Sequence, residues 1–255
     1  MIFTFSVIFV LGFFTLVIMF FKAKENNLTR NDLGFSNFPS SFGTLTIFFI
    51  SDIHRRHLSD KLLNKIDQSV DLVIIGGDLM ESGVPFSTVE ENVRKLKKIA
   101  PTYFVWGNND YEVDYHKLDS ILIDQGVKIL DNTAVSFESL TNEKINLLGV
   151  DDLKDDRDKL ETALNDCSKN GFRILVSHNP DILNKVQDMH KISLILSGHT
   201  HGGQIRFFNI GLYEKGRVYK KPQSTILISN GYGTTQLPLR LGAPAEAHLI
   251  TIRNG

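Results

Sequence analysis

The stretch LTIFFISDIH, residues 45–54, sets a pattern for the chain: an apolar run ends in two side chains that can bind a metal. Residues two apart on an extended strand project to the same side, so Asp52 and His54 can hold one ion. Ligand sites in α/β sheets form at strand ends, because the strand is rigid and the adjoining loop is free to vary. Further ligands are therefore expected wherever another apolar run of this kind ends.

Apolar, β-type runs recur along the chain, and helical stretches separate the first six of them. Strand–helix alternation followed by a strand-rich tail predicts an α/β fold with a mixed sheet or two. Three later runs have no long helix between them and indicate antiparallel pieces. The first six are Leu45–Ile50, Leu72–Ile75, Tyr103–Trp106, Ile145–Val150, Phe172–Val176 and Ile192–Leu196, and the later three are Ile205–Phe208, Thr225–Ile228 and His248–Ile252.

Three helices are expected between these runs. Ser87 and Glu90 have the spacing of a capping box, and Pro101 ends the helix that follows. The second helix is expected from about 158 to 171, and the third from about 180 to 190.

Metal-binding residue types follow five of the runs. Seven candidate ligands exceed the three or four that one tetrahedral ion takes, and they suit two ions about 3.5–4 Å apart that share a carboxylate. Imidazole, carboxylate and amide without sulfur suit Mn, Fe or Zn, and the single Cys167 cannot form a thiolate cage. Each motif alone is typical of a turn or a surface loop, but together they predict a metal centre. The candidate ligands are Asp52, His54, Asp78, Asn108, His178, His199 and His201.

The order of these motifs resembles that of the calcineurin-like metallophosphoesterases: Asp-x-His, Gly-Asp, Gly-Asn-x-Asp, an isolated His, then Gly-His-x-His. The longer GHTHGGQ, residues 198–204, is similar to the bacterial membrane-associated branch of that family, as are NGYGT at 230–234 and LPLR at 237–240. The resemblance extends from about residue 38 to the C-terminus. It implies a four-layer αββα sandwich of two mixed β-sheets, with the metals at the sheet edges.

The resemblance also implies a role for each ligand. One divalent metal would take Asp52, His54, Asp78 and His201, and the other would take Asp78, Asn108, His178 and His199, so that Asp78 is the bridge. Two such cations generate hydroxide from water near neutral pH for in-line attack on phosphorus, and they offset charge on the phosphoryl oxygens. The candidate catalytic residues are those of the third motif, Asn108, Asn109 and Asp110.

At one position the chain departs from the family pattern. Members commonly have a histidine after the Gly-Asn of the third motif, where this chain has Asn109. An amide can donate a hydrogen bond to a phosphoryl oxygen but cannot give up a proton, and losing a general acid typically costs roughly 10²–10⁴-fold in rate. A preference for phosphodiesters, pyrophosphate bonds or activated esters over alkyl monoesters is therefore expected. His57 and His116 lie near the motifs in sequence and are candidates to replace the missing histidine, although surface positions are the commoner outcome for such residues.

The N-terminus has a different composition. Residues 1–21 carry no charged side chain, and as a helix they would span roughly 30 Å, the thickness of a bilayer's hydrocarbon core. A cleaved signal peptide would need a basic leader and a small-residue cleavage site, and neither is evident. Residues 1–21 are therefore expected to be a retained, single-pass transmembrane anchor in the cell membrane, 22–37 a connector and 38–255 the metallophosphoesterase domain. Lys22, Lys24 and Arg30 follow the apolar stretch, which predicts a cytoplasmic domain.

The expected partners are a membrane and a phosphoester substrate. A net charge of -1 argues against a general nucleic-acid binder, which usually carries a basic excess. The anchor favours a substrate at the membrane, such as a lipid-linked one. Two alternatives stay open: a binding module of the same fold that has lost catalysis, favoured by Asn109, and another metallohydrolase such as an amidohydrolase, in which the paired histidines would normally come on the first strand.

Overall fold

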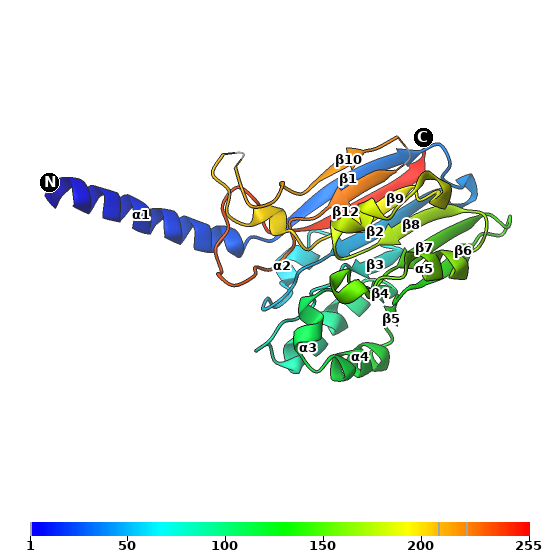
Figure 1. The fold of residues 1–255 in the computed structure, drawn as a ribbon, viewed down its shortest axis with the longest axis horizontal. Coiled ribbons are helices and arrows are strands. Elements are labelled where there is room, and N and C mark those ends of the chain that lie inside the picture. Colours follow the sequence, from blue (N-terminus) through cyan, green and yellow to red (C-terminus); the bar gives the residue numbers. More distant parts are fainter. Residues whose placement is uncertain (1, 209, 223) are drawn as a thin grey trace.

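The computed structural model describes residues 2–208, 210–222 and 224–255 (Figure 1). Met1, which belongs to the predicted anchor, lies outside the described residues. Within these ranges the chain forms two six-stranded sheets, and a long N-terminal helix projects from one end of the molecule (Figure 1).

The first sheet has the strand order β1-β12-β2-β3-β4-β5. Strands β2 to β5 are parallel to one another, β12 is antiparallel to β2, and β1 is parallel to β12. Because β2, β3 and β4 are parallel, their carboxyl ends meet at one edge. The strands span Asn27–Phe35 (β1), Thr44–Ile50 (β2), Leu72–Ile75 (β3), Thr102–Phe104 (β4), Lys128–Ile129 (β5) and Glu246–Asn254 (β12).

The second sheet has the order β10-β11-β9-β8-β7-β6. Strands β7, β8, β9 and β11 are parallel, while β6 and β10 are antiparallel to their neighbours at the two edges. Both sheets are therefore mixed. The strands span Thr133–Glu138 (β6), Lys144–Gly149 (β7), Phe172–Val176 (β8), Leu194–Ser197 (β9), Arg217–Lys220 (β10) and Thr225–Ile228 (β11).

Three clusters of buried apolar side chains divide the domain into four layers. The largest joins Phe49 and Ile74 of the first sheet to Ile174 and Leu196 of the second, so it fills the space between the sheets. A second cluster packs the outer face of the first sheet against α2, α3 and α4, and a third packs the second sheet against α5. The expected αββα sandwich is confirmed. The helices are α2 (Asp60–Leu63), α3 (Phe86–Lys97), α4 (Tyr115–Asp124) and α5 (Leu160–Asp166).

Most predicted strands agree with the structure to within two residues, but Ile205–Phe208 is wrong. Its backbone makes isolated bridges to residues 241, 242 and 210 and joins neither sheet. The predicted capping box is also wrong, because the N-cap of α3 is Pro85 and Ser87 lies inside the first turn.

The third predicted helix is replaced by two short 3-10 helices, Pro180–Asn184 and Asp188–His190. Turn-forming Asn184 and Asp188, with β-branched Val186 between them, do not favour a continuous helix.

The predicted connector, residues 22–37, is wrong over most of its length because it contains β1. This strand pairs with β12 over its whole length, from Asn27 to Phe35, and Leu33 is buried in the core between the sheets. The segment is polar because β1 is an edge strand in which Leu33 is buried and the other side chains are partly buried or exposed. Its sequence therefore lacks the apolar run of a buried strand.

Helix α1 (Ile2–Ala23) is a candidate membrane span. From Thr4 to Ala23 it is long and apolar enough to cross a bilayer, and most of its described side chains are exposed, unlike those of a core helix. Its C-terminal end docks on the domain: the carbonyl of Met19 accepts a hydrogen bond from the N–H of Arg240 at 3.0 Å, and Arg56 donates to the backbone carbonyls of residues 23 to 25.

Candidate metal centre

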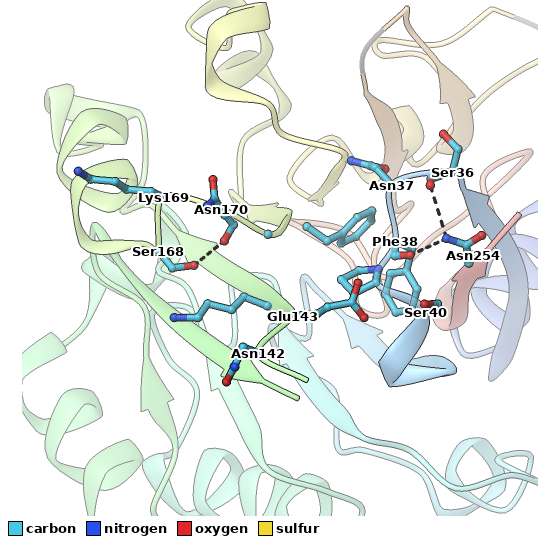
Figure 2. Close-up of a pocket in the computed structure, with 14 residues that line it drawn as sticks. Ser36, Asn37, Phe38, Ser40, Asn142, Glu143, Ser168, Lys169, Asn170 and Asn254 are labelled. Atoms are coloured by element: carbon cyan, nitrogen blue, oxygen red, sulfur yellow. Dashed lines mark hydrogen bonds between the residues drawn. The ribbon is translucent and has the colours of Figure 1, made fainter. Parts of the chain in front are cut away.

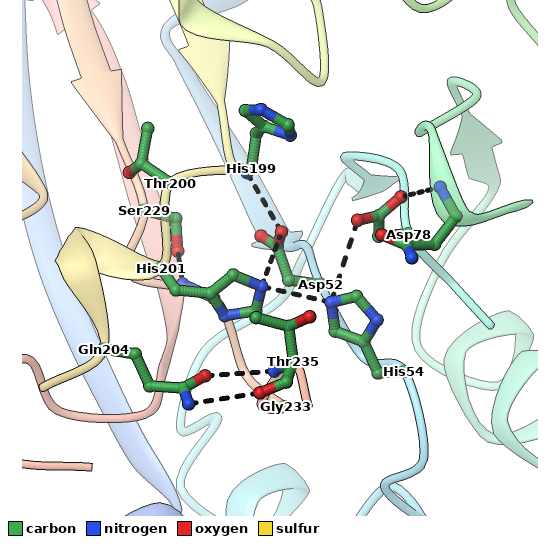
Figure 3. A network of polar contacts seen from close by, with 12 residues as sticks. Asp52, His54, Asp78, His199, Thr200, His201, Gln204, Ser229, Gly233 and Thr235 are labelled. Atoms are coloured by element: carbon green, nitrogen blue, oxygen red, sulfur yellow. Dashed lines mark hydrogen bonds and ion pairs between the residues drawn. The ribbon is translucent and has the colours of Figure 1, made fainter. Parts of the chain in front are cut away.

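The carboxyl ends of β2, β3 and β4 face those of β8 and β9, and the predicted ligands gather between them (Figure 3). Asp52 and His54 follow β2, Asp78 follows β3, and His199 and His201 follow β9. Strands that belong to different sheets and lie far apart in the sequence thus supply one cluster of polar side chains.

One half of the cluster contains Asp52, His54 and His201. Nε2 of His54 lies 3.1 Å from Nε2 of His201, and Nε2 of His201 lies 3.5 Å from Oδ1 of Asp52. All three residues are buried, and their ligand atoms lie within 4.8 Å of one another, so the group can surround one ion.

The other half is centred on Asp78 and His178. Nε2 of His178 lies 3.3 Å from Oδ2 of Asp78 and 3.2 Å from Nδ1 of His199. The same Oδ2 lies 3.7 Å from Nε2 of His54, so Asp78 touches both halves. Asp52 also belongs to a candidate metal-binding group with Asp78 and His178, so both carboxylates lie between the two halves.

Unpaired polar atoms in this cluster fit the binding of cations. Oδ2 of Asp52 and Oδ1 of Asn108 are buried and have no hydrogen-bond partner. A buried polar atom without a partner is costly, and both atoms are good ligands for a hard or borderline divalent metal. The donor set of this chain therefore fits the two divalent ions expected from the sequence.

Electrostatics in the cluster also favour a cation. Burial is the largest influence on the pKa of His178 and lowers it. The charge and hydrogen bond of Asp78, with smaller contributions from Asp52 and the carbonyl of Gly76, together outweigh burial and raise the pKa to about 10. A proton on His178 then neutralises Asp78, and a divalent cation would take its place, because a metal-bound histidine is neutral. Burial lowers the pKa of His201 to about 3, which keeps that imidazole in the form that binds a metal.

Five of the seven predicted ligands have left-handed backbone conformations, which are uncommon outside glycine and cost about 1 kcal/mol or more each. Sharp turns of this kind directly after a strand aim successive side chains at one point, and such strain gathers at functional sites. The φ angles are 53° for Asp52, 51° for His54, 49° for Asp78, 71° for His199 and 50° for His201.

His178 and His54 each have a contact at Nδ1, the ring nitrogen that does not face the cluster. Nδ1 of His178 lies 2.9 Å from the carbonyl oxygen of Gly76, and Nδ1 of His54 lies 3.0 Å from Oε2 of Glu81. A partner on the second ring nitrogen fixes the tautomer that leaves Nε2 free for a metal. The contact of Glu81 with His54 was not predicted from the sequence, although Glu81 lies only three residues after the candidate ligand Asp78.

Arg240 is a second residue whose role was missed. Its side chain is fully buried and donates to backbone carbonyls that include those of Asn230 and Gly233, both at 2.6 Å. Its Nη2 lies 3.1 Å from Nδ1 of His201. This guanidinium holds the loop 230–244 against the ligand cluster, which gives a physical reason for the LPLR motif.

Gln204, the last residue of GHTHGGQ, fastens the same loop from the other side (Figure 3). Its amide oxygen accepts from the N–H of Thr235 at 3.0 Å, and its amide nitrogen donates to the carbonyls of Thr235 and Leu237. The motif therefore contributes two ligand candidates and a fastening for the loop that covers them.

The predicted catalytic residues of the third motif take different places. Asn108 and Asn109 line the hollow over the cluster, and the backbone N–H of Asn109 donates to Oδ1 of Asp78 at 2.8 Å. Asp110 is fully buried, and its two oxygens accept from the N–H groups of Met80 and Gly107. Asp110 therefore shapes the loop rather than facing the hollow.

The histidines considered as substitutes at the third motif lie elsewhere. His57 is exposed beside Glu91, and His116 stacks on Tyr115. Neither belongs to the described lining of the hollow over the cluster.

The hollow over the cluster has a volume of about 410 Å³. Its floor is polar, with Asp78, Asn108 and His199, and its rim includes Leu212 and Leu237. A larger hollow of about 740 Å³ lies at the opposite end of the second sheet, where β7 and β8 begin (Figure 2). Half of its described lining is serine and asparagine, and Glu143, Lys144 and Lys169 add charged groups.

Comparisons with known proteins agree with this geometry. The family model described as calcineurin-like phosphoesterase matches residues 45–203. The chain is 47% identical to the uncharacterized protein YpbG of Bacillus subtilis, over 92% of this chain and 90% of that protein. It is 31% identical to the phosphodiesterase YaeI of Escherichia coli, over 72% and 70% of the two chains.

A further relative, 29% identical, is a transmembrane protein with metallophosphoesterase domain from Danio rerio, matched over 84% of this chain and 54% of that protein. Together with the apolar helix α1, this likeness supports a membrane association. From the match of the family model over residues 45–203, the chain is a member of the calcineurin-like phosphoesterase family.

Proposed function

We propose that this protein hydrolyses a phosphodiester, a pyrophosphate or an activated phosphoester at a membrane, using two divalent metal ions. The observation that carries the proposal is the convergence of seven candidate ligands from two sheets, in the motif order of a phosphoesterase family. The phosphodiesterase named among the relatives supports a diester as the substrate class.

The proposed metal sites follow the two halves of the cluster. One ion, which could be Mn, Fe or Zn, would be held by Asp52, His54, Asp78 and His201, and the other by Asp78, Asn108, His178 and His199. Ions so held activate a water for attack on phosphorus and offset charge on the phosphoryl oxygens.

The chain's own groups would position the substrate. Asn108 and Asn109 lie at the hollow, where an amide N–H can donate to a phosphoryl oxygen. The side-chain amide of Asn109 donates to Glu112 at 3.0 Å, and it cannot protonate a leaving oxygen. We therefore propose that good leaving groups are required, which favours diesters, pyrophosphates and activated esters over alkyl monoesters.

The test compares bis(p-nitrophenyl) phosphate, p-nitrophenyl phosphate and an alkyl monoester, with Mn added to the full chain in detergent. Asp78→Asn should lower diester hydrolysis by about a thousandfold or more, because it weakens both ion sites at once. Asp67→Asn, on the surface beside Arg30, is the matched control and should keep the wild-type rate. Alkyl monoesters that turn over as fast as matched diesters would refute the role given to Asn109.

We further propose that α1 is a retained anchor and that the domain faces the cytoplasm. Basic residues lie on the domain side of the span, at Lys22, Lys24 and Arg30, and basic flanks favour the cytoplasmic side. In spheroplasts, protease added from outside should leave the domain intact until the membrane is permeabilised. Digestion before permeabilisation would reverse the orientation.

A binding module of the same fold is the second candidate, and Asn109 favours it because the commonly present histidine is missing. Metal bound at the cluster without turnover of any ester in the assay above would establish this alternative.

A further inference from the structure

A set of exposed apolar side chains lies at or near the hollow over the cluster, and Leu212, Tyr213 and Leu237 among them line it. Phe208 and Leu212 are almost fully exposed, at 99% and 83%. Single exposed apolar residues are ordinary on a protein surface, but a contiguous patch indicates an interaction. We call this set the apolar rim; its members are Phe207, Phe208, Ile210, Leu212, Tyr213 and Leu237.

Hydrogen bonds hold part of the segment that carries most of the apolar rim. Phe207 and Ile210 exchange two backbone hydrogen bonds of 3.0 Å. Arg206 is buried and donates to the carbonyls of Gly202 and Tyr213. Hydrogen bonds therefore hold the backbone of Phe207 and Ile210 and the side chain of Arg206, beside the exposed side chains of this segment.

The apolar rim connects two parts of the molecule. Leu212, Tyr213 and Leu237 line the same hollow as the ligand candidates Asp78 and His199. Three residues after Leu237, the N–H of Arg240 bonds to the carbonyl of Met19 in the last turns of α1. In Figure 1 the loops around 205–215 and 232–242 lie beside the end of α1 at which the helix enters the domain.

We propose that the apolar rim rests in the membrane that α1 enters, and that it passes an amphiphilic phosphoester from the bilayer to the metal centre. The aliphatic and aromatic side chains would sit at the boundary of headgroups and acyl chains, where tyrosine is favoured. The apolar part of the substrate would lie between Leu212 and Leu237, and its phosphoester would reach the floor of the hollow. The substrate part of this inference rests on the proposed function, whereas the membrane contact does not.

Membrane contact is tested first, without any assay of activity. In a Cys167→Ser background, Phe208→Cys carries an environment-sensitive fluorophore, and the full chain is reconstituted in phosphatidylcholine–phosphatidylglycerol vesicles that contain spin-labelled lipid. Leu140→Cys is the matched control, because Leu140 is equally exposed but lies in the turn between β6 and β7, away from α1. Quenching at position 208 and not at 140 is the expected result. Equal quenching at the two positions would overturn the proposal.

The substrate class is tested with two diesters that differ in one chain, hexadecyl p-nitrophenyl phosphate in the vesicles and methyl p-nitrophenyl phosphate in solution. Phe208→Ser/Ile210→Ser should lower the ratio of the hexadecyl to the methyl rate by on the order of tenfold. Leu140→Ser/Met189→Ser, which changes two other exposed apolar residues, should keep the wild-type ratio. An unchanged ratio in the first variant would refute the transfer of an amphiphile. Hydrolysis of neither diester would refute the proposed function, and the quenching result would still decide the membrane contact.

Discussion

Gly198 lies where the Cβ of any other residue would collide with neighbouring side chains. A Cβ at Gly198 would lie 2.4 Å from Oδ2 of Asp52 and 2.5 Å from Oγ of Ser51. A Cβ atom essentially never lies this close to a heavy atom to which it is not bonded, so Asp52 would have to move. The geometry of one proposed metal site therefore depends on a glycine that binds nothing itself.

We predict that Gly198→Ala lowers the metal content of the purified protein. The added methyl group displaces the carboxylate of Asp52, and removing a ligand from its place weakens the ion held there. Elemental analysis after dialysis against trace Mn measures the effect, and roughly one ion per chain should be lost. Gly34→Ala is the control, because its Cβ would meet its nearest neighbour at an ordinary 3.5 Å. Equal metal content in the two variants would contradict the prediction.

The sequence predicts the candidate ligands at this scale better than it predicts their supports. Asp52 and His54 could be identified because a strand pattern leads directly into them. Glu81 and Arg240 could not, because their roles depend on contacts with His54 and His201 that only the folded chain creates. Their places in the sequence, three residues after Asp78 and within the LPLR motif, do not show which side chains they contact.

Strand β12 contains a buried histidine with a fixed hydrogen-bonding pattern. Nδ1 of His248 lies 3.1 Å from Oδ1 of Asn31 in β1, and Nε2 lies 3.0 Å from Oγ of Ser229. An amide oxygen can only accept, so Nδ1 carries the proton and Nε2 accepts from the serine hydroxyl. Burial lowers the pKa of His248, more than the nearby charge of Glu246 raises it.

We predict that His248 destabilises the fold in mild acid. The unfolded chain takes up a proton on this residue below about pH 6.5, while the folded state resists it. The stability is therefore present above the unfolded pKa and is lost as the pH falls towards the lower folded pKa, by about 1 kcal/mol per pH unit. Urea unfolding of the full chain in detergent, at about pH 7.5 and 5.5, measures the slope. His248→Gln should unfold with a smaller pH dependence, and an identical slope would show that another group is responsible.

Strand β1 leads to a prediction about where the domain begins. Its nine pairs with β12 and the buried Leu33 make it part of the first sheet. A chain from Lys24 to Gly255 should fold, whereas a chain from Phe38 should lose several kcal/mol of stability, because burial of Leu33 is lost and β12 becomes an unprotected edge. Urea midpoints and the tendency to aggregate compare the two. Equal midpoints would mean that the segment is a connector after all.

The elements themselves differ in how well the sequence predicts them. A strand buried on both faces, such as β3, appears as a continuous apolar run. The polar edge strand β1 and the 3-10 turns after Pro180 do not, because neighbours rather than local propensity decide their conformation.

At the scale of the whole molecule, the motif order carried the most information about the fold. The four-layer sandwich followed from the resemblance and is confirmed, whereas periodicity alone predicted only an α/β protein with one or two mixed sheets. The relation of α1 to the site was not predictable, because it depends on the contact of Met19 with Arg240.

The two sheets contribute to the cluster from opposite halves of the chain, with residues 52–108 on one side and 178–201 on the other. Ions held between the two sheets would link them reversibly. The stabilisation of the folded state would depend on the free concentration of the ion relative to its dissociation constant. An ion at a hundred times its dissociation constant adds about 2.7 kcal/mol to the folded state. The free concentration of that ion would then govern how long the protein survives, and metal starvation would raise the unfolded fraction that is open to degradation.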